Sequence, residues 1–466
     1  MEIHKRRFAA TAACGALVAA VAVAAISGYQ HCASAGRDAD LVLSSPHEPT
    51  AFPLSVVPGQ RYLSDAQGKP FLLHGDAAWS LIADLSREEV DVYLADRRAR
   101  GFNTILVNLL EHRFARKAPA NVYGEPPFSQ PGRFDLPNEA YFAHADWVLS
   151  RASDMGFLVI LTPAYTGWHG EEEGWWKEMV AAGGEVLYAY GKYLGVRYRH
   201  LVNVVWLDGG DYDPPDKDLV RQIARGIRAG APHQLHSVHT APETVAADFW
   251  NAESWIDLLP VYTYRSVCPG VRHALADERR RPVFLLESTY ENEHGGSGGM
   301  VRAQAYEALL CGAAGTIYGN NPIWHFNHPG LYESPGNWWQ NLGSQGAQSM
   351  THLVNLFSEL PWWKMEPDVT RSEVDAKRQQ TLPVSAFAPD GTLELMYLRE
   401  RQGITLDLTR FASEVVAAEW FDPTSGARTP VDGSPLAKGG ARRVTPPGRN
   451  HAGDNDWVLL LRSVPE

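Results

Sequence analysis

The sequence has 466 residues, of which 45% are hydrophobic and 21% are charged, so the chain can bury a large core and is not disordered. Its formal net charge is −12, and we expect no basic patch, which argues against nucleic acid as a partner. Most of its 15 Trp residues are expected in the core, although indole rings also stack on the flat faces of sugars.

The N-terminus has the pattern of an export signal. The basic run Lys5–Arg7 precedes the apolar, Ala-rich stretch Ala9–Ile26, and Ala33–Ala35 offers a small-x-small cleavage pattern. We therefore expect a signal peptide over residues 1–35 and a secreted or periplasmic protein. The apolar run, about 18 residues long, could instead remain as an uncleaved membrane anchor.

Cysteine spacing gives little information. Cys14 and Cys32 lie in the expected signal, which leaves Cys268 and Cys311 without the paired spacing of a zinc site. After export these two could form one disulfide, or they could be two unrelated buried thiols.

Beyond a polar, proline-containing linker over residues 36–52, short apolar runs alternate with amphipathic stretches. The apolar runs are rich in Val, Ile and Leu, which predicts a parallel sheet that is covered on both faces. The predicted strands are Phe71–Gly75, Asn103–Asn108, Phe157–Thr162, Asn203–Leu207, Gln234–His239, Leu258–Tyr262, Val283–Glu287 and Gly315–Gly319.

Helical patterns lie between these strands. Eight strand–helix units over about 300 residues fit a (β/α)8 TIM barrel better than an open sheet, and we expect this barrel over residues 53–365. The predicted helices are Arg87–Arg100, Tyr141–Met155, Gly184–Tyr198, Leu219–Ala229, Val301–Cys311 and Gly343–Leu360.

The pattern changes after Pro361-Trp362-Trp363 to short alternating strands with turn signals such as Asp390-Gly391. We expect residues 366–466 to form a small antiparallel β-sandwich or partial barrel, an accessory domain that contributes no catalytic residue. Its predicted strands are Pro383–Phe387, Leu393–Leu398, Gly403–Leu408, Glu414–Phe421 and Trp457–Leu461.

The active site of a (β/α)8 barrel forms at the C-terminal ends of its strands. Here those ends carry carboxylates, aromatics and amides, with no Lys for a Schiff base and no Gly-rich phosphate loop. The residues that we expect to bind substrate are His74, Asp76, Trp79, Asn108, Tyr165, Trp168, His239, Tyr262, Tyr290 and Trp324.

Two strand-end carboxylates could perform glycosidic bond cleavage, which needs a proton donor and a nucleophile or base. Asp211 follows the fourth strand after Gly209-Gly210, a pair that lets the backbone turn and present the side chain. Glu287 directly follows the apolar run Val283–Leu286, so it should lie at the tip of the seventh strand. We therefore expect Asp211 and Glu287 to be the catalytic pair.

Each carboxylate has an alternative interpretation. Asp211 could cap the following helix, and Asp208 is its nearest competitor for the catalytic role. Glu287 could instead form a buried ion pair, with Glu291 as the second candidate.

Three of the predicted substrate contacts also have alternatives. His74, Asp76 and His239 could be internal hydrogen-bond partners, or could bind a metal ion, although their spacing has no specific metal signature. We therefore expect no metal and no other cofactor.

Five motifs follow one another in order: Phe71–Trp79, Arg97–Asn103, Trp206-x-x-Gly-Gly-Asp211, Glu287–Glu291 and Gly312–Asn320. With them, residues 60–365 resemble the apiosidase-like glycoside hydrolases. The resemblance implies a (β/α)8 barrel, a role in the breakdown of polysaccharides by bacteria, with removal of apiose from pectin side chains, and catalytic roles for Asp211 and Glu287.

The chain departs from this family at two positions, where Ala77 and Ser288 replace the Thr and Pro that the family often has. The C-terminal part has three further motifs, Leu395–Leu398, Thr405–Leu408 and Trp420–Gly426. With them it resembles the small collagen-binding-type β-domain that is usually fused to such barrels.

We therefore expect an exported glycoside hydrolase that acts on complex, plant cell-wall or pectic glycans. Carboxylates at opposed strand tips should lie close enough, roughly 5–5.5 Å, for a retaining mechanism with Glu287 as nucleophile and Asp211 as acid/base. The alternatives are a non-catalytic glycan- or matrix-binding protein on a degenerate barrel, and a metal-dependent hydrolase. The expected partner is an oligo- or polysaccharide, with no membrane contact beyond an N-terminal anchor.

Overall fold

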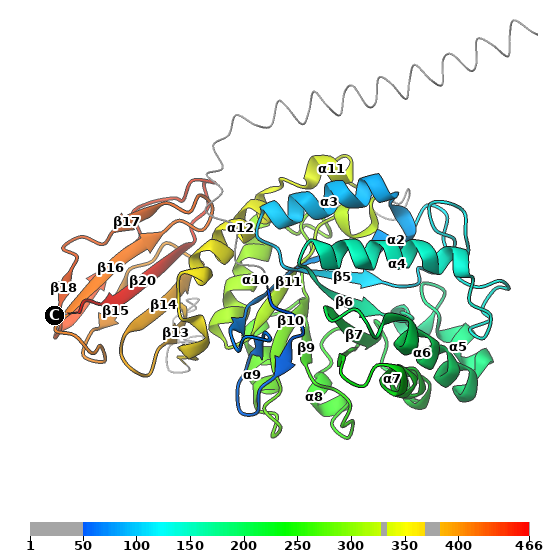
Figure 1. Cartoon of the computed structure of the whole chain (residues 1–466). Coiled ribbons are helices and arrows are strands. Elements are labelled where there is room, and N and C mark those ends of the chain that lie inside the picture. The colour runs from blue at the N-terminus through cyan, green and yellow to red at the C-terminus, as the bar shows by residue number, and fades with distance from the viewer. Residues whose placement is uncertain (1–49, 328–332, 369–382, 466) are drawn as a thin grey trace, which may run out of the picture. The chain divides into compact units, whose positions relative to one another are not determined.

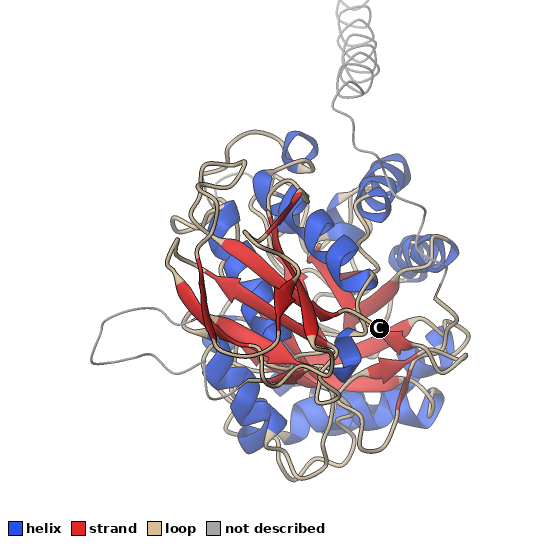
Figure 2. Cartoon of the chain, turned by 90° about the vertical axis from the view of Figure 1, so that its left-hand side faces the viewer, coloured by secondary structure: helices blue, strands red, loops and turns tan. Residues whose placement is uncertain are grey.

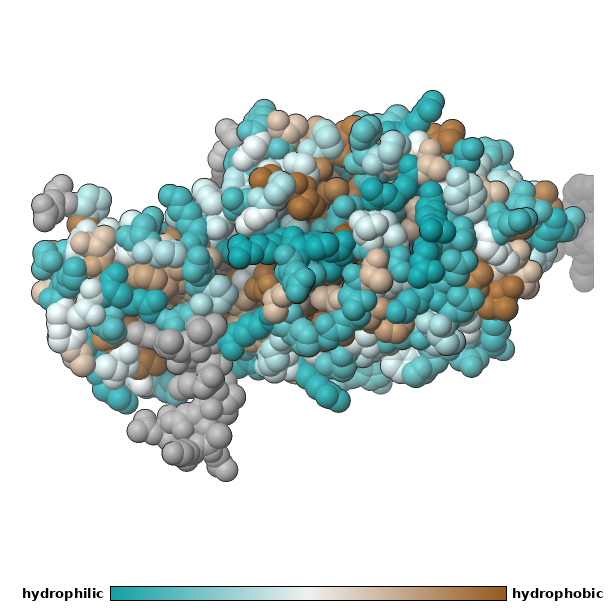
Figure 3. All heavy atoms as spheres, turned by 90° about the horizontal axis from the view of Figure 1, so that it is seen from below, coloured by the Kyte–Doolittle hydropathy of each residue, from teal (hydrophilic) through white to brown (hydrophobic). Residues whose placement is uncertain are grey.

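The computed structural model describes residues 50–327, 333–368 and 383–465 (Figure 1). The expected signal peptide, and the expected linker apart from its last three residues, lie outside these ranges. Among the described helices, none is long and apolar enough to cross a membrane. On the face drawn in Figure 3, hydrophilic residues predominate and apolar residues occur in small groups among them.

The predicted TIM barrel is confirmed. An eight-stranded sheet has the order β8-β7-β6-β5-β4-β11-β10-β9, and each neighbouring pair in this order is parallel. The strands begin and end within about two residues of their predicted bounds. They are β4 (Leu73–Ala77), β5 (Thr104–Asn108), β6 (Leu158–Thr162), β7 (Val204–Gly209), β8 (Leu235–His239), β9 (Leu259–Tyr262), β10 (Val283–Glu287) and β11 (Gly315–Tyr318).

The barrel closes between β8 and β9, whose described residues form no regular ladder. The backbone oxygen of His236 accepts hydrogen bonds from the backbone N–H groups of Asp257 at 2.8 Å and Leu258 at 3.2 Å. The hydroxyl of Ser237 donates to the backbone oxygen of Leu258 at 3.1 Å. These bonds satisfy polar groups that an open sheet edge would leave exposed.

Helices surround the strands (Figure 1). Ser86 and Glu89 form a capping box that fixes the start of α3. Five described helices, α2, α5, α8, α9 and α11, were not predicted, because they are short. Of these, α9 also has Pro269 in its first turn, where proline is tolerated. The helices are α2 (Leu81–Asp84), α3 (Arg87–Ala99), α4 (Glu139–Asp154), α5 (Trp176–Ala182), α6 (Gly184–Tyr198), α7 (Asp218–Gly230), α8 (Ala246–Phe249), α9 (Val267–Leu275), α10 (Gly298–Leu310), α11 (Trp338–Asn341) and α12 (Gln345–Ser358).

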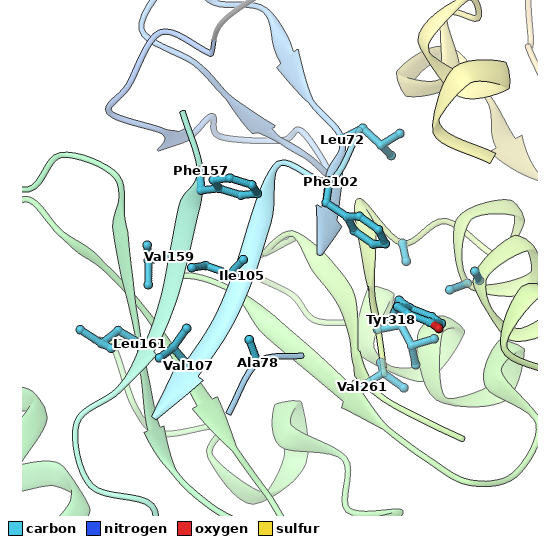
Figure 4. Close-up of a cluster of buried hydrophobic side chains, with 14 of the residues drawn as sticks. Leu72, Ala78, Phe102, Ile105, Val107, Phe157, Val159, Leu161, Val261 and Tyr318 are labelled. Carbon is cyan, nitrogen blue, oxygen red and sulfur yellow. The ribbon is translucent and has the colours of Figure 1, made fainter. Parts of the chain in front are cut away.

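Side chains of the barrel strands alternate between two cores, as successive strand residues point to opposite faces. The outer core lies between strands and helices, and Figure 4 shows part of it, including Ile105, Val107, Val159 and Leu161. The inner core fills the barrel itself. Its strand residues include Leu73, Ala77, Leu106, Leu158, Ile160, Val205, Leu207, Phe284, Leu286 and Ile317.

Antiparallel sheets follow the barrel, as predicted, and Figure 2 shows their strands in front of the barrel helices. The larger sheet has the order β12-β13-β14-β20-β16-β17 with β18 paired to β16, and β15 pairs with β19. A small sheet, β1 (Ser55–Val56), β2 (Leu63–Ser64) and β3 (Pro70–Phe71), precedes the barrel. The C-terminal strands are β12 (Glu366–Pro367), β13 (Val384–Phe387), β14 (Leu393–Leu398), β15 (Ile404–Asp407), β16 (Val415–Phe421), β17 (Arg428–Pro430), β18 (Leu436–Ala437), β19 (Ala441–Val444) and β20 (Trp457–Ser463).

Buried polar contacts join the C-terminal sheets to the barrel. The guanidinium of Arg302, on α10, donates two hydrogen bonds of 2.7 Å to the carboxylate of Asp456. The hydroxyl of Tyr397 donates to the same carboxylate at 2.7 Å, and its ring stacks on that of Tyr306. The C-terminal sheets are thus packed on helix α10.

Cys268, on α9, and Cys311, at the end of α10, form a disulfide. The question that the sequence leaves open, one disulfide or two separate thiols, is therefore answered. The bond joins two neighbouring helices on the outside of the barrel.

Candidate active site

A cavity of about 630 Å³ lies at the C-terminal ends of the barrel strands. Its wall combines aromatic rings with a few convergent polar groups, a composition typical of a small-molecule site. Nine of the residues expected at the site line it. The lining residues are Trp79, Asn108, Phe114, Tyr165, Trp168, Glu173, Asp211, Tyr262, Tyr264, Glu287, Thr289, Tyr290, Glu293, His294, Met300 and Trp324.

Asp211 reaches the cavity because two glycines turn the chain at the end of β7. Gly209 has a φ of +103°, in the region that side chains disfavour. A Cβ atom at Gly210 would lie 2.5 Å from the backbone nitrogen of Thr166, so only glycine fits there. The carboxylate of Asp211 then accepts a hydrogen bond of 2.9 Å from the hydroxyl of Tyr165.

The competitor Asp208 does not reach the cavity. It lies on β7 with its side chain on the outer face of the barrel, as Val204 and Trp206 do, and it is buried. Its carboxylate lies 2.9 Å from the Nδ1 atom of His236 on the neighbouring strand. Asp208 is therefore half of a buried structural pair.

A β-bulge brings Glu287 into the cavity. Along β10, Leu285 pairs with Val261 but Glu287 pairs with the next residue of β9, Tyr262, so Leu286 is an extra residue. Phe284 and Leu286 both pack in the inner core, and in a regular strand Glu287 would face outward. The bulge shifts this alternation by one residue and turns Glu287 inward.

Glu291 is the second candidate for the catalytic carboxylate at the end of the seventh strand, but it is buried and makes structural hydrogen bonds. Its carboxylate accepts hydrogen bonds from the backbone N–H of Gly346 at 2.9 Å and the hydroxyl of Ser344 at 2.7 Å. It also accepts from the amide of Asn320 at 3.2 Å and from the hydroxyl of Tyr318. These bonds tie the loop after β10 to β11 and α12, away from the cavity.

The two cavity carboxylates lie close together. Asp211, His239 and Glu287 each place one polar atom within 4.8 Å of the others. Burial, and then the nearby charge of Glu287, raise the pKa of Asp211 to about 7, although His239, Tyr165 and Tyr262 act in the opposite direction. Asp211 therefore keeps its proton at pH values where an ordinary Asp is ionised.

His239 lies between these carboxylates but does not line the cavity. Its Nε2 atom is 3.3 Å from an oxygen of Glu287, and its Nδ1 atom is 3.5 Å from an oxygen of Asp211. Among the described residues these three form the one cluster with spacing suited to a metal ion.

His74 and Asp76 do not reach the cavity, contrary to the expectation that they bind substrate. They share the outward face of β4, because the alternating residues Leu73 and Ala77 occupy the inner core. The ring of His74 stacks on Phe102 at 4.6 Å. Asp76 accepts a hydrogen bond of 2.6 Å from the hydroxyl of Tyr93, and burial raises its pKa to about 6.

Several cavity residues were not predicted. Tyr264 lies just beyond β9, and its hydroxyl lies 3.0 Å from that of Tyr262 and 3.4 Å from an oxygen of Glu287. Glu293 accepts a hydrogen bond of 2.9 Å from the indole of Trp324, and burial raises its pKa. The unpredicted lining residues are Phe114, Glu173, Tyr264, Thr289, Glu293, His294 and Met300. Met300 lies in the first turn of α10, and the others come from loops without periodic patterns.

The loop that carries Glu293 has an unusual backbone. Asn292 and His294, the residues on either side of Glu293, have φ values of 66° and 49°. Residues other than glycine hold such values at a cost, and they cluster at functional sites. The strained loop turns Glu293 toward the cavity.

Two family models match the chain. The model described as "Apiosidase-like, catalytic domain" matches residues 57–364. The model described as "Putative collagen-binding domain of a collagenase" matches residues 373–462. A search of curated proteins gave no match.

Solved structures show the same fold. The chain is similar to a glycoside hydrolase family 5 protein from Bacteroides vulgatus ATCC 8482, with 22% identity, a TM-score of 0.77, and coverage of 90% of this chain and 96% of that one. A structure titled "Glycoside hydrolase" matches with 22% identity and a TM-score of 0.77, covering 90% of this chain and 99% of the other. A further structure, whose title reads "putative glycoside hydrolase from Bacteroides vulgatus ATCC 8482", matches with 17% identity and a TM-score of 0.66, over 89% of this chain and 82% of the other.

Proposed function

The chain belongs to the apiosidase-like family, and from this membership we propose that it is a retaining glycoside hydrolase with Glu287 as nucleophile and Asp211 as acid/base. One observation carries the proposal. Oxygens of Asp211 and Glu287 lie within 4.8 Å of each other in the same cavity. Retaining enzymes place their carboxyl groups about 5–5.5 Å apart, and inverting enzymes need about 6.5–9.5 Å to admit a water molecule.

In the first step, Asp211 donates its proton to the glycosidic oxygen while Glu287 attacks the anomeric carbon. The bond to the leaving group breaks, and a glycosyl ester forms on Glu287. In the second step, the ionised Asp211 takes a proton from a water molecule, which attacks the same carbon and releases the sugar. The raised pKa of Asp211 supports this assignment, because a general acid must hold a proton near neutral pH.

The proposed substrate is an uncharged glycosyl unit of a complex, plant cell-wall or pectic glycan, with apiose as the first sugar to test. The family description motivates apiose. Aromatic rings such as Trp168 and Tyr264 offer faces for sugar C–H groups, and both rings are partly exposed to solvent. Among the described residues that line the cavity there is no Lys or Arg to pair with a sugar carboxylate.

The two departures from the family pattern do not change the wall of this cavity. Ala77 packs in the inner core, and Ser288 is buried. Neither residue lines the cavity. Apiose therefore stays on the list of substrates despite both replacements.

We also propose that the protein is exported to the periplasm or the medium. The disulfide between Cys268 and Cys311 supports this, because such bonds persist in oxidising compartments. The N-terminal sequence pattern, with its basic start and Ala-rich apolar run, points the same way. N-terminal sequencing of the protein recovered from its natural host should give a start near Gly36.

The test of the activity is release of monosaccharide from a panel of pectic and other plant oligosaccharides. Asp211→Ala and Glu287→Ala should each lower turnover by about 10²-fold or more, whereas Asp208→Asn, on the outer face, should retain activity if it folds. Proton NMR should show the retained anomer first. An inverted first product would overturn the mechanism, and binding without turnover by the wild-type protein would favour a glycan-binding protein.

A further inference from the structure

His239 is a buried base between the two proposed catalytic carboxylates. It ends β8 with its side chain on the inner face of the barrel, and that side chain is 1% exposed. Nε2 lies within hydrogen-bond distance of Glu287, at 3.3 Å, whereas Nδ1 faces Asp211 at 3.5 Å without a hydrogen bond. The imidazole thus contacts the two carboxylates unequally.

Aromatic rings hold the imidazole in this orientation. The ring of Tyr262 lies 5.3 Å away at an angle of 31°, the edge of Trp79 lies 5.7 Å away, and Tyr165 lies 6.3 Å away. These rings come from three different strand ends and leave little room for the imidazole to turn. The unequal contacts are therefore fixed by packing.

We propose that His239 is a positioning residue that keeps Glu287 ionised and leaves the acid proton on Asp211. A hydrogen bond from Nε2–H to a carboxylate stabilises the charged form of that carboxylate. Nδ1 of His239 lies farther from Asp211 and makes no hydrogen bond to it, so the imidazole stabilises the charged form of Asp211 less. Two carboxylates that share one cavity are thereby given different protonation states, which the proposed nucleophile and acid require.

The titratable groups that face His239 are Asp211 after β7, Glu287 on β10, Tyr262 on β9 and Tyr165 after β6. Burial lowers the pKa of His239, but the hydrogen bond to Glu287 and the charges of both carboxylates outweigh it, so the net direction is upward. This direction agrees with an imidazole that donates to an ionised Glu287. Only the kinetic consequence of this inference rests on the proposed function.

The protonation states can be tested without a substrate. In ¹H–¹⁵N correlation spectra of the histidine side chains of the full chain, the resonance lost in His239→Gln belongs to His239. Its pKa should fall by more in Glu287→Gln than in Asp211→Asn, because only Glu287 is expected to be the charged partner. Equal falls, or a larger fall in Asp211→Asn, would overturn the proposal. If His239→Gln does not fold, the same comparison is made on whichever histidine resonance responds to either carboxylate variant.

The kinetic test uses a matched control on the same strand. His239 and His236 are both buried on β8 beside a carboxylate, but His236 faces outward to Asp208. On any glycan that the wild-type enzyme cleaves, His239→Gln should lower kcat about 10- to 100-fold and move the acid limb of the kcat/KM profile to higher pH. The expected cause is the loss of the contact with Nε2 of His239, which in the proposal stabilises the charged form of the Glu287 carboxylate.

His236→Gln should leave that limb in place. A folded His239→Gln enzyme with an unmoved acid limb would overturn the proposal, whatever its kcat. If the wild-type protein cleaves no glycan, the proposed function fails, and the NMR comparison still decides the roles of His239, Asp211 and Glu287 in the cavity.

Discussion

Asp211 and Glu287 have the same functional group in different surroundings. Asp211 follows a glycine turn and accepts a hydrogen bond from Tyr165, while Glu287 faces His239 and Tyr264. Burial and the nearby charge of Glu287 raise the pKa of Asp211 to about 7, which is the behaviour that the acid of the proposed mechanism needs. Strand position in the sequence predicts the same roles, and the surroundings of Asp211 supply a physical reason for its role.

Activity should decline as the pH rises through about 7. The raised pKa of Asp211 means that its neutral, proton-donating form persists up to about that pH and is lost above it. The basic limb of the kcat/KM profile measures this loss. In Asp211→Ala, assayed with an aryl glycoside whose leaving group needs no proton, this limb should be absent. A basic limb that persists in that variant would assign it to another group.

Glu293→Gln should lower kcat/KM by about 10- to 100-fold, because a charged acceptor for a sugar hydroxyl is replaced by a neutral one. Glu293 is held by Trp324 in the cavity wall, so the substitution preserves shape. Glu173→Gln is the comparison, since Glu173 pairs with the exposed Arg113 at 3.3 Å. A larger effect in Glu173→Gln would place sugar recognition at the rim of the cavity.

At the scale of the element, strand alternation decides which strand-end residues can reach the substrate. The sequence predicts all eight barrel strands, because short apolar runs rich in Val, Ile and Leu alternate with helical patterns. Such a run does not tell which face a polar residue at its end takes. His74 and Asp76 were assigned to the cavity for this reason. Because Leu73 and Ala77 face the inner core on β4, the alternating residues His74 and Asp76 face outward and lie outside the cavity.

The disulfide between α9 and α10 should stabilise the barrel. Replacing both Cys268 and Cys311 by Ser should lower the free energy of unfolding by about 2–4 kcal/mol, because the cross-link restricts the unfolded chain. Thermal unfolding followed by circular dichroism measures the change. Reductant should lower the Tm of the wild-type protein and leave that of the double variant unchanged. A wild-type Tm that is insensitive to reductant under unfolding conditions would contradict this prediction.

At the scale of the whole molecule, the ion pair between Arg302 and Asp456, in which both side chains are buried, is among the contacts that link the barrel to the C-terminal sheets. Arg302→Met leaves the carboxylate of Asp456 buried without its guanidinium partner, so the free energy of unfolding should fall by about 3–5 kcal/mol. Urea unfolding measures the loss. Arg133→Met, which breaks an ion pair with Asp135 on the surface, should change stability by less than about 1 kcal/mol. If the two variants lost the same free energy of unfolding, the buried pair between Arg302 and Asp456 would stabilise the protein no more than the surface pair does.

The barrel, the antiparallel sheets and nine cavity residues could be predicted because they depend on local patterns and on the general place of active sites in barrels. Tyr264, Glu293 and the other loop residues could not, since loops have no period from which their direction follows. The pairing of Cys268 with Cys311 depends on how two helices pack, which no spacing in the chain encodes.

The bulge gives β10 one residue more than the paired stretch of β9. If Leu286 were deleted, Glu287 would directly follow the outward-facing Leu285 and could still pair with Tyr262, so its side chain would keep the inner face of the barrel. The inner core would instead lose the side chain of Leu286. A change of chain length at this point would therefore be absorbed by the packing of the barrel interior, and not by the position of the carboxylate.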